Sequence, residues 1–403
     1  MKGLLFLSLM LIAPAISALE LAEAERLAIE SDPQLEAIDA RSRASGHLAV
    51  SEAQLPDPAL ELGAQSVPLP SFDVREEPMT QFQLGIEQRV PARSQREAAV
   101  QRQRAEQDAL ALHADARTLQ VRAAVRAEWT EIVGLQSLID LTLQRARLLA
   151  RYSDALDDGV QNGRVSQQTL LEGRTRELRV QRTLTQLRVR LAERRAELEV
   201  WLPGIELPDA LDPIVLSEPA RIDIDSHPAV LAAGSEALVA EAGIAAARSA
   251  FDPGWSWSLG VGRRIGDVPS GAPDETLLNA RLRIELPFFT GDRQSQRLAA
   301  ARESHRAALS APVDARRGLS ARLDRAEQRA TQFYDLARSY AEDILPRSLE
   351  AAEAARDKYR NGSIPLEDVL AAEVEVLDVR HERIEAQIEV DRARVDLAYL
   401  GGI

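Results

Sequence analysis

Four segments of the chain alternate apolar and polar residues with a period of two. They come in two pairs, one in each half of the chain, and each runs for about 9–11 residues, the length of a tilted strand that crosses a bilayer. Because successive side chains of a strand point to opposite faces, the alternation predicts strands with one apolar face. A segment taken singly fits an ordinary half-buried strand equally well. The apolar positions are Leu60, Leu62 and Ala64; Phe82, Leu84 and Ile86; Trp255, Trp257, Leu259 and Val261; and Leu278, Ala280, Leu282 and Ile284.

The stretches after these strand pairs show the helical period instead. From about Arg93 to the turn before Gly163 the chain has no proline and almost no glycine, and a helix of ~60 residues is ~90 Å long. Steps of three and four residues predict coiled-coil seams in this helix and in the last one. Shorter helices are expected over Leu21–Gln54 and Ile222–Ala250. The seam residues are Val121, Val125, Trp129, Ile132, Leu135 and Ile139, and then Leu370, Val374, Leu377, His381, Ile384 and Ile388.

The chain also contains an internal repeat. Ser31–Leu35 matches Ser226–Val230, and further landmarks recur in the same order. Repetition of one plan predicts two structural repeats, each a helix, two strands and a long helical hairpin. The predicted organisation is a signal peptide at 1–18, a first repeat at 19–202, a Pro-rich linker at 203–221 and a second repeat at 222–403. The other matching pairs are Leu55–Pro58 with Ala250–Pro253, Arg89–Pro91 with Glu285–Pro287, Gln161–Arg164 with Arg360–Ser363, and Trp201–Gly204 with Tyr399–Gly402.

The first residues have the layout of a secretory signal peptide. Lys2 precedes an apolar run from Leu4 to Ile12, and small residues follow as far as Ala18, which predicts cleavage and export. The chain has no cysteine and a formal charge of −14, so disulfides, thiolate metal sites and nucleic acid binding are not expected. No later stretch reaches about 18 consecutive apolar residues, so we expect no transmembrane helix, and a membrane protein of this composition would be a β-barrel.

Candidate catalytic and metal chemistry is sparse. The five histidines have no HxxxH or HExxH spacing, and one of them, His381, lies on the last coiled-coil seam, where packing is its expected role. Gly260-Val261-Gly262 lies inside a predicted strand and therefore is not a nucleotide loop. No carboxylate pair is set apart as acid and base. We therefore expect no enzyme activity, no cofactor and no resident metal.

Each long hairpin is predicted to turn at an Asn-Gly pair. The turns are Asn162-Gly163-Arg164 and Asn361-Gly362-Ser363, since glycine readily takes the left-handed conformation that ends a helix. Ser166 can cap the returning helix of the first hairpin, and Pro365 suits the first turn of the second. A plain interhelical turn explains either tip as well as a functional contact does.

Taken together, these features resemble the TolC family of outer-membrane factors over essentially the whole mature chain. The most specific matches are Asp57-Pro58, Pro78–Gly85 and Tyr359–Leu370. The resemblance implies an α+β membrane protein, a homotrimer with four strands per chain in a 12-stranded β-barrel, continued by a long α-helical barrel of coiled-coil hairpins. It implies location in the outer membrane with a periplasmic extension. The implied partners are outer-membrane lipid, a periplasmic adaptor and an inner-membrane pump, most typically of the RND type.

The same resemblance implies particular site residues. The hairpin tips, Asn162 to Arg164 and Asn361 to Ser363, would meet the adaptor. Asp368 and Tyr359 would lie at the gate, with Glu367 and Glu373 as reinforcement, and a carboxylate ring there would favour cations. Two gate positions depart from the family pattern, where the chain has Ala371 and Ile364, and acids in a helix's first turn are also favoured by the helix dipole alone. Aromatic residues near strand ends would form an interfacial belt: Trp255, Trp257, Phe288 and Phe289.

The function implied is a passive gated exit duct of a tripartite efflux system. The Pro78-Met79-Thr80-Gln81 strand resembles channels paired with heavy-metal exporters, so heavy-metal cations are the favoured cargo. Multidrug efflux and type I protein secretion are the alternatives within this class. A soluble periplasmic coiled-coil adaptor or spacer is the alternative of a different class, and it would need no membrane-facing strands.

Overall fold

The computed structural model describes residues 19–216, 221–265 and 275–403. The predicted signal peptide, residues 1–18, lies outside the described residues, as do residues 217–220 of the predicted linker and residues 266–274 between the last two strands. The chain divides into two compact units. We call them the helical unit (described residues of Met1–Pro33, Thr118–Asp223 and Ser320–Ile403) and the sheet unit (Gln34–Arg117 and Ile224–Leu319).

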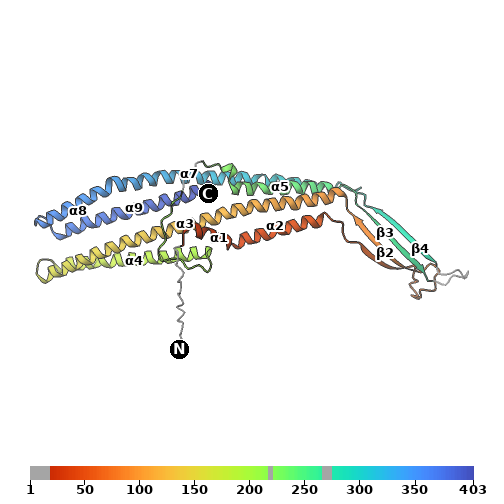
Figure 1. The fold of residues 1–403 in the computed structure, drawn as a ribbon, viewed down its shortest axis with the longest axis horizontal. Helices are drawn as coiled ribbons and strands as arrows, with labels where there is room; N and C mark the ends of the chain where they lie inside the picture. Colours follow the sequence, from red (N-terminus) through yellow and green to blue (C-terminus); the bar gives the residue numbers. More distant parts are fainter. Residues whose placement is uncertain (1–18, 217–220, 266–274) are drawn as a thin grey trace, which may run out of the picture. The chain divides into compact units, whose positions relative to one another are not determined.

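Both halves of the chain supply their elements in the same order (Figure 1). The first half contains α1 (Leu21–Glu30), α2 (Pro33–Glu52), β1 (Ala59–Gln65), β2 (Gln81–Val90), α3 (Arg93–Gln161) and α4 (Gln167–Trp201). The second half contains the short helix η1 (Ile224–Ser226), α5 (Pro228–Ser249), β3 (Trp255–Arg264), β4 (Thr276–Ile284), α6 (Gln294–Ala308), α7 (Ser310–Ser339), the π-helical turn η2 (Tyr340–Ile344), α8 (Leu345–Arg360) and α9 (Leu366–Leu400).

The four strands form one antiparallel sheet in the order β1-β2-β3-β4. Strands β2, β3 and β4 have 10, 10 and 9 residues, as predicted, whereas β1 has 7. The shorter β1 follows from its ends: Pro58 precedes it without an amide hydrogen, and Ser66 adopts a φ of 60° immediately after it. The Thr80 hydroxyl donates to the Ser66 carbonyl at 2.7 Å and holds this turn against β2.

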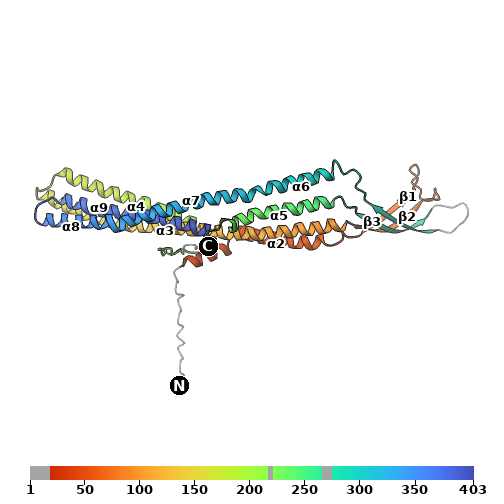
Figure 2. The same ribbon diagram turned by 90° about the horizontal axis from the view of Figure 1, so that it is seen from above.

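Helices of the sheet unit anchor the sheet through backbone carbonyls. The Gln95 side-chain amide, near the start of α3, donates to the carbonyls of Ser249 and Asp252 at 3.3 and 3.1 Å. This ties α3 to the connection between α5 and β3. Helices α5 and α6 run side by side in the same unit (Figure 2).

One helix meets the length and hydropathy criteria for a membrane span, contrary to the sequence expectation of none. It is α5, with a mean hydropathy of 1.5 over its most apolar window. Its apolar character comes largely from alanines, whose small side chains suit close helix packing, and α5 packs against α6. It also carries Glu236, whose carboxylate lies 3.1 Å from the His113 imidazole of α3. These contacts describe a packed helix of the sheet unit.

The helical unit is a layer of helices in the order α4, α3, α9 and then α7 with α8 (Figure 1). Apolar side chains join neighbours in this order: Leu187 of α4 packs with Leu135 and Leu138 of α3, and Ile384 and Ile388 of α9 pack against the same cluster. Ion pairs continue the order to the last helices, from Asp396 of α9 to Arg322 of α7 and from Glu373 of α9 to Arg356 of α8. Of the predicted seams, Leu135 and Ile139 of α3 therefore contact Ile384 and Ile388 of α9 between the two hairpins.

A second core lies where α1 and the segment after α4 fold onto α3. Trp129 is 1% exposed and packs with Val125 and Ile132 of α3. The other buried members of this cluster are Ala24, Ala28, Val121, Leu198, Leu202, Leu207 and Leu211. Part of the predicted Pro-rich linker, including Leu207 and Leu211, therefore packs into the helical unit.

Two predicted helices are interrupted. The helix expected over Leu21–Gln54 is divided into α1 and α2. Helix α1 ends at Ser31, whose amide and hydroxyl both donate hydrogen bonds to the Leu27 carbonyl. A new helix then starts at Pro33. The helix expected over Ile222–Ala250 is divided into the short helix η1 and α5. Helix α5 begins at Pro228, where His227 Nδ1 accepts a hydrogen bond from the Ala229 amide at 3.1 Å. In contrast, α3 is continuous over 69 residues, as its lack of proline predicts.

Candidate functional site

One face of the sheet is apolar across all four strands. The strand register places Leu62, Leu84, Val261 and Leu278 in one row, and Leu84 in the middle of the sheet is still 48% exposed. No segment among the described residues covers this face enough to bury any of its large side chains. The exposed members are Leu60, Leu62, Phe82, Leu84, Ile86, Trp255, Trp257, Leu259, Val261, Leu278, Leu282 and Ile284.

The opposite face of the same sheet is polar. The Ser256 hydroxyl donates to the Glu87 carboxylate at 2.9 Å, and Arg283 lies 3.8 Å from the same carboxylate. The register brings these residues together on the three strands β2, β3 and β4. The sheet thus has one exposed apolar face and one hydrogen-bonded polar face, a pattern that is typical of strands between lipid and water.

The predicted interfacial aromatics lie at one end of the sheet. Trp255 pairs with Ile284, and Trp257 pairs with Leu282, both on the apolar face. Phe288 and Phe289 follow β4, and Phe289 is 92% exposed. Their location fits the predicted aromatic belt, whose membrane contact remains a prediction.

Both hairpin tips have the same hydrogen-bonded geometry. Gly163 and Gly362 adopt φ values of 68° and 70°. The Arg164 amide donates to the Gly159 carbonyl at 2.8 Å, and the Ser363 amide donates to the Lys358 carbonyl at the same distance. These are six-to-one bonds of the Schellman helix ending, which requires the left-handed conformation at the glycine. The predicted Asn-Gly turns are therefore present, and they leave the tips exposed.

Helix starts at the tips differ in part from expectation. Ser166 caps α4 as predicted, since its side-chain oxygen accepts the Thr169 amide at 3.1 Å. Pro365 is the residue before the first turn of α9 and its side chain makes no cap. The Pro365 carbonyl instead accepts the Asp368 amide at 3.2 Å, which fixes Asp368 in the first turn.

The predicted gate residues lie near one another but differ in their partners. Glu367 is 3.7 Å from Arg176 of α4, and Glu373 accepts a hydrogen bond from Arg356 of α8 at 2.7 Å. Asp368 is exposed and has no ion-pair partner among the residues that the structure describes. Tyr359, at the end of α8, is also exposed. Of the three acids, Asp368 alone is thus left available to solutes at the tip.

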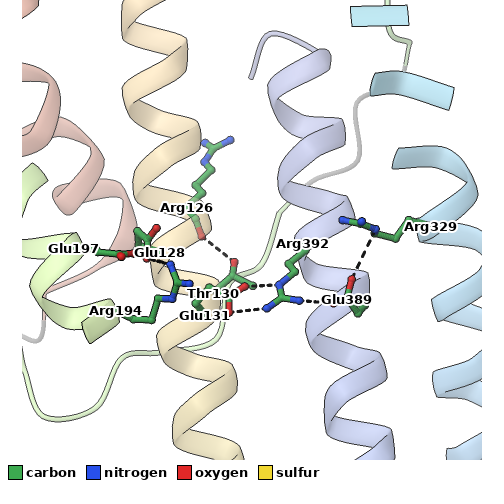
Figure 3. Close-up of polar contacts among 9 residues, drawn as sticks. All are labelled: Arg126, Glu128, Thr130, Glu131, Arg194, Glu197, Arg329, Glu389 and Arg392. Carbon is green, nitrogen blue, oxygen red and sulfur yellow. Dashed lines mark hydrogen bonds and ion pairs between the residues drawn. The ribbon is translucent and has the colours of Figure 1, made fainter. Parts of the chain in front are cut away.

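Away from the tips, a belt of ion pairs crosses the helical unit (Figure 3). Arg194 of α4 lies 3.4 Å from Glu128 of α3 and pairs with Glu197 at 2.6 Å. Arg392 of α9 binds Glu131 of α3 through two nitrogens, one of them at 2.7 Å. The bidentate geometry suits a guanidinium and a carboxylate.

The belt continues beyond α9 to α7. Glu389 of α9 binds Arg392 and lies 3.7 Å from Arg329 of α7. Opposite charges therefore alternate from α4 to α7, and each helix is tied to the next. These residues carry no distinctive sequence signal, because opposite charges at seam-flanking positions occur throughout the chain.

Burial raises the pKa of Glu128 above its ordinary value, the negative charge of Glu197 adds to this, and Arg194 opposes both. Burial likewise raises the pKa of Asp391, on α9 next to the belt, while Gln387 and Arg394 oppose it. In the described part of the chain no group of three or more His, Cys, Asp or Glu residues is placed to hold a metal ion.

Comparisons with known proteins agree with this arrangement. Residues 224–402 match the family model described as outer membrane efflux protein. No curated protein matches the chain in sequence. About 95% of the chain nevertheless superposes on solved structures of outer-membrane proteins, and the TM-scores show that the fold is shared.

Three of these channels show how far the similarity extends. CusC, studied for its folding and transmembrane channel formation, has a TM-score of 0.77 at 15% identity, with 95% of this chain and 92% of that chain covered. The outer membrane protein VceC of Vibrio cholerae has a TM-score of 0.74 at 16% identity, with coverages of 95% and 96%. The outer membrane channel MtrE of Neisseria gonorrhoeae, in its open state, has a TM-score of 0.73 at 18% identity, with coverages of 95% and 89%.

The match therefore has two independent parts. Residues 224–402 carry the family's sequence pattern, and the first half of the chain has its elements in the same order as the second. Residues 224–402 of this chain thus match the outer membrane efflux protein family in sequence, and about 95% of the chain shares the fold of solved outer-membrane proteins.

Proposed function

We propose that this chain is the outer-membrane channel subunit of a tripartite efflux system. In this proposal three copies form a passive gated duct, an inner-membrane pump of the RND type supplies energy and cargo, and a periplasmic adaptor joins pump and duct. The observation that carries the proposal is the sheet with an exposed apolar face and a polar reverse face.

The proposal follows from what each face of the sheet requires. Burying large apolar side chains is worth about 1.5–3 kcal/mol each, and a bilayer offers that burial to the row around Leu84. The polar face around Glu87 and Ser256 needs water, which a lumen supplies. Strands β1 and β4 are the edges of the sheet, and a sheet in lipid must have no open edge. Pairing β1 of one copy with β4 of the next would close twelve strands in three chains.

A soluble adaptor is the alternative of a different class, and the sheet argues against it. A soluble protein rarely leaves a contiguous apolar surface of this kind open to water. The chain also has two long helical hairpins, α3 with α4 and α7–α8 with α9. Both hairpins are needed for the wall of a duct, whereas an adaptor needs one.

For the cargo we favour cations, and heavy-metal cations among them. Of the three predicted gate acids, Asp368 is the one without an ion-pair partner in the described chain, and three copies would place three such carboxylates around one entrance. A ring of acids attracts cations and repels anions. Drug efflux and type I protein secretion, the other two uses of such a duct, would not depend on this charge.

The test of the proposed function uses two adjacent residues of β2 that face opposite sides of the sheet. We expect Leu84→Arg to abolish recovery from the outer-membrane fraction, because an arginine on the lipid face near mid-bilayer costs about 2–4 kcal/mol. Gln83→Arg, on the polar face, is the matched control and should be recovered normally. Recovery of both variants and of the wild type in the soluble periplasm would overturn the channel in favour of an adaptor.

A further inference from the structure

The helical unit contains a cavity of about 780 Å³ on one face of its layer of helices. Every helix position of the layer contributes to the cavity walls: α4, α3, α9 and the stretch from α7 into η2. The volume lies within the range of small-molecule sites in proteins, about 300–1,000 Å³. Because one chain supplies all the walls, the cavity is complete without a second copy.

The cavity opens on the face of the layer that the linker leaves uncovered. On α3, Trp129 donates its hydrogen bond to the linker carbonyl of Asp212, whereas Leu135 and Leu138 line the cavity. At about 100° per residue, these two sets of side chains are centred about 150° apart around the helix axis. In the proposed duct, the face with the cavity is therefore the one available to the passage, because α1 and the linker cover the other.

The floor of the cavity is apolar. Leu135 and Leu138 of α3 pack with Leu187 of α4, and Ile388 of α9 packs against the same cluster. Burial of apolar surface is worth about 25 cal/mol per Å². The floor therefore stabilises the apolar body of an organic molecule and offers no ligand to a hydrated metal ion.

One wall of the cavity combines aromatic rings with carboxylates. Phe333 and Tyr340 line it from α7 and η2, and Glu382 and Glu385 line it from α9. The Tyr340 hydroxyl is hydrogen-bonded to the Glu382 carboxylate, so that ring and acid are held together. Burial of Tyr340 and this hydrogen bond raise the pKa of the hydroxyl, which therefore keeps its proton. Aromatic faces attract organic ammonium ions, and a carboxylate beside them adds the opposite charge.

The arginines of the other walls do not cancel this charge. Arg194 and Arg392 belong to the ion-pair belt, where each lies beside two carboxylates (Figure 3). Arg190 and Glu193, one turn apart on α4, contribute opposite charges. Glu382 has no ion-pair partner among the residues that the structure describes. The cavity therefore has its uncompensated negative charge at the aromatic wall.

The π-helical turn η2 lies against this wall. Phe333, Leu336 and Tyr340 recur in steps of three and four residues, so they share one stripe of the helix. All three line the cavity, and Tyr340 is the first residue of η2. Single π-helical turns occur frequently at functional sites. The turn therefore marks the same place as the aromatic wall and the acids.

We propose that this cavity binds an organic cation, with the cationic group between Glu382 and the Tyr340 ring and the apolar body over Leu135 and Leu138. Binding itself needs one chain only. The link to transport rests on the proposed function: in a duct, the wall would hold organic cations part of the way along the passage. The tip acid Asp368 would then respond to positive charge alone, and the cavity to positive charge on an apolar body.

Two ions of nearly the same shape and opposite charge test the proposal. They are tetraphenylphosphonium and tetraphenylborate, titrated into the purified protein in neutral detergent by isothermal titration calorimetry, with detergent alone as the blank. We expect tetraphenylphosphonium to bind at one site per chain. Tetraphenylborate should bind about tenfold more weakly, as expected when a cation–aromatic contact is lost. Equal binding of the two ions would overturn the site, because it would show apolar partition only.

Variants of the aromatic wall locate the bound cation. Glu382→Gln should weaken tetraphenylphosphonium binding several-fold, since it removes the charge but keeps an acceptor for Tyr340. Tyr340→Leu should also weaken binding several-fold, whereas Tyr340→Phe keeps the ring and should bind like the wild type. Unchanged binding in both Glu382→Gln and Tyr340→Leu would overturn the proposal.

A matched control tests whether any loss of negative charge has the same effect. Glu327→Gln removes an exposed acid of α7 that lies about 120° around the helix from Phe333. Its binding of tetraphenylphosphonium should equal that of the wild type, and a loss as large as in Glu382→Gln would overturn the assignment to the cavity. Helicity measured by circular dichroism should be the same in all variants.

The remaining outcomes separate this inference from the proposed function. Displacement of tetraphenylphosphonium by cobalt(II) would indicate a metal site and overturn the organic cation. A three-chain protein of the outer membrane that does not bind tetraphenylphosphonium would overturn the cavity site and leave the duct intact. A soluble monomer that binds it would support the cavity site and overturn the duct.

Discussion

The indole Nε1 of Trp129 donates a hydrogen bond of 2.8 Å to the backbone carbonyl of Asp212. Trp129 is on α3 and is 1% exposed, whereas Asp212 belongs to the Pro-rich segment after α4. The bond closes that segment over the apolar cluster formed by α1, α3 and α4. A residue that the sequence marked only as a seam position is therefore also the anchor of the linker.

We predict that Trp129→Ala lowers the free energy of unfolding by about 3–5 kcal/mol, as expected for removal of a buried large aromatic side chain. Trp129→Phe should cost about 1–3 kcal/mol, because it keeps a ring but leaves the Asp212 carbonyl unpaired. Denaturant unfolding in detergent, followed by helical circular dichroism, measures both. The exposed Trp257→Phe is the control and should change little; equal losses for all three variants would contradict the anchoring role.

The raised pKa of Glu128 predicts a pH dependence of stability. A carboxyl whose pKa is higher in the folded state binds a proton more tightly there, so stability from this group falls as pH rises through that raised value. Relative to Glu128→Gln, which cannot titrate, the wild type should therefore gain stability on going from neutral to mildly acidic pH. Melting temperatures of the two proteins across this range measure the difference, and a difference that stays constant with pH would contradict it.

Asp368 should control ion selectivity. We expect Asp368→Asn to lower the cation preference of single channels in planar bilayers, because it removes a carboxylate that no ion pair in the described chain neutralises. Glu367→Gln is the matched control at the neighbouring position, where Arg176 already offsets the charge, and its effect should be smaller. Unchanged selectivity in Asp368→Asn would remove this residue from the gate.

Substitutions at the tip glycines can distinguish the effect of backbone strain from the effect of a lost contact with the adaptor. Gly163→Arg and Gly362→Arg place a bulky residue at each tip, and we expect loss of efflux with normal amounts of protein in the outer membrane. Gly204→Arg is the control: Gly204 has a φ of 78°, similar to the tips, and like them it has open space where a side chain would begin. Loss of efflux in all three variants would attribute the effect to strain and not to adaptor docking.

Local features of the chain were predictable because they depend on neighbours in sequence. The absence of proline from Arg93 to the first tip produces α3 as one helix, and the Asn-Gly pairs produce the two Schellman turns. The strand alternation around Leu84 follows from the two-residue period of an extended chain. The break between α1 and α2 is equally local, because Pro33 starts a second helix inside the segment that was expected to form one helix over Leu21–Gln54.

The partners of individual side chains were decided only by the tertiary structure. Glu367, Asp368 and Glu373 are alike in sequence, yet Arg176 and Arg356 neutralise two of them from other helices. The belt of Arg392 and Glu131 joins residues far apart in the chain, and periodicity carries no information about such distances. The sequence by itself determined which helices and strands form and which of their faces are apolar, because these depend on local conformation and side-chain period. Only the tertiary structure decided which charged residues form ion pairs and which apolar helix faces remain exposed, because both depend on how the helices pack.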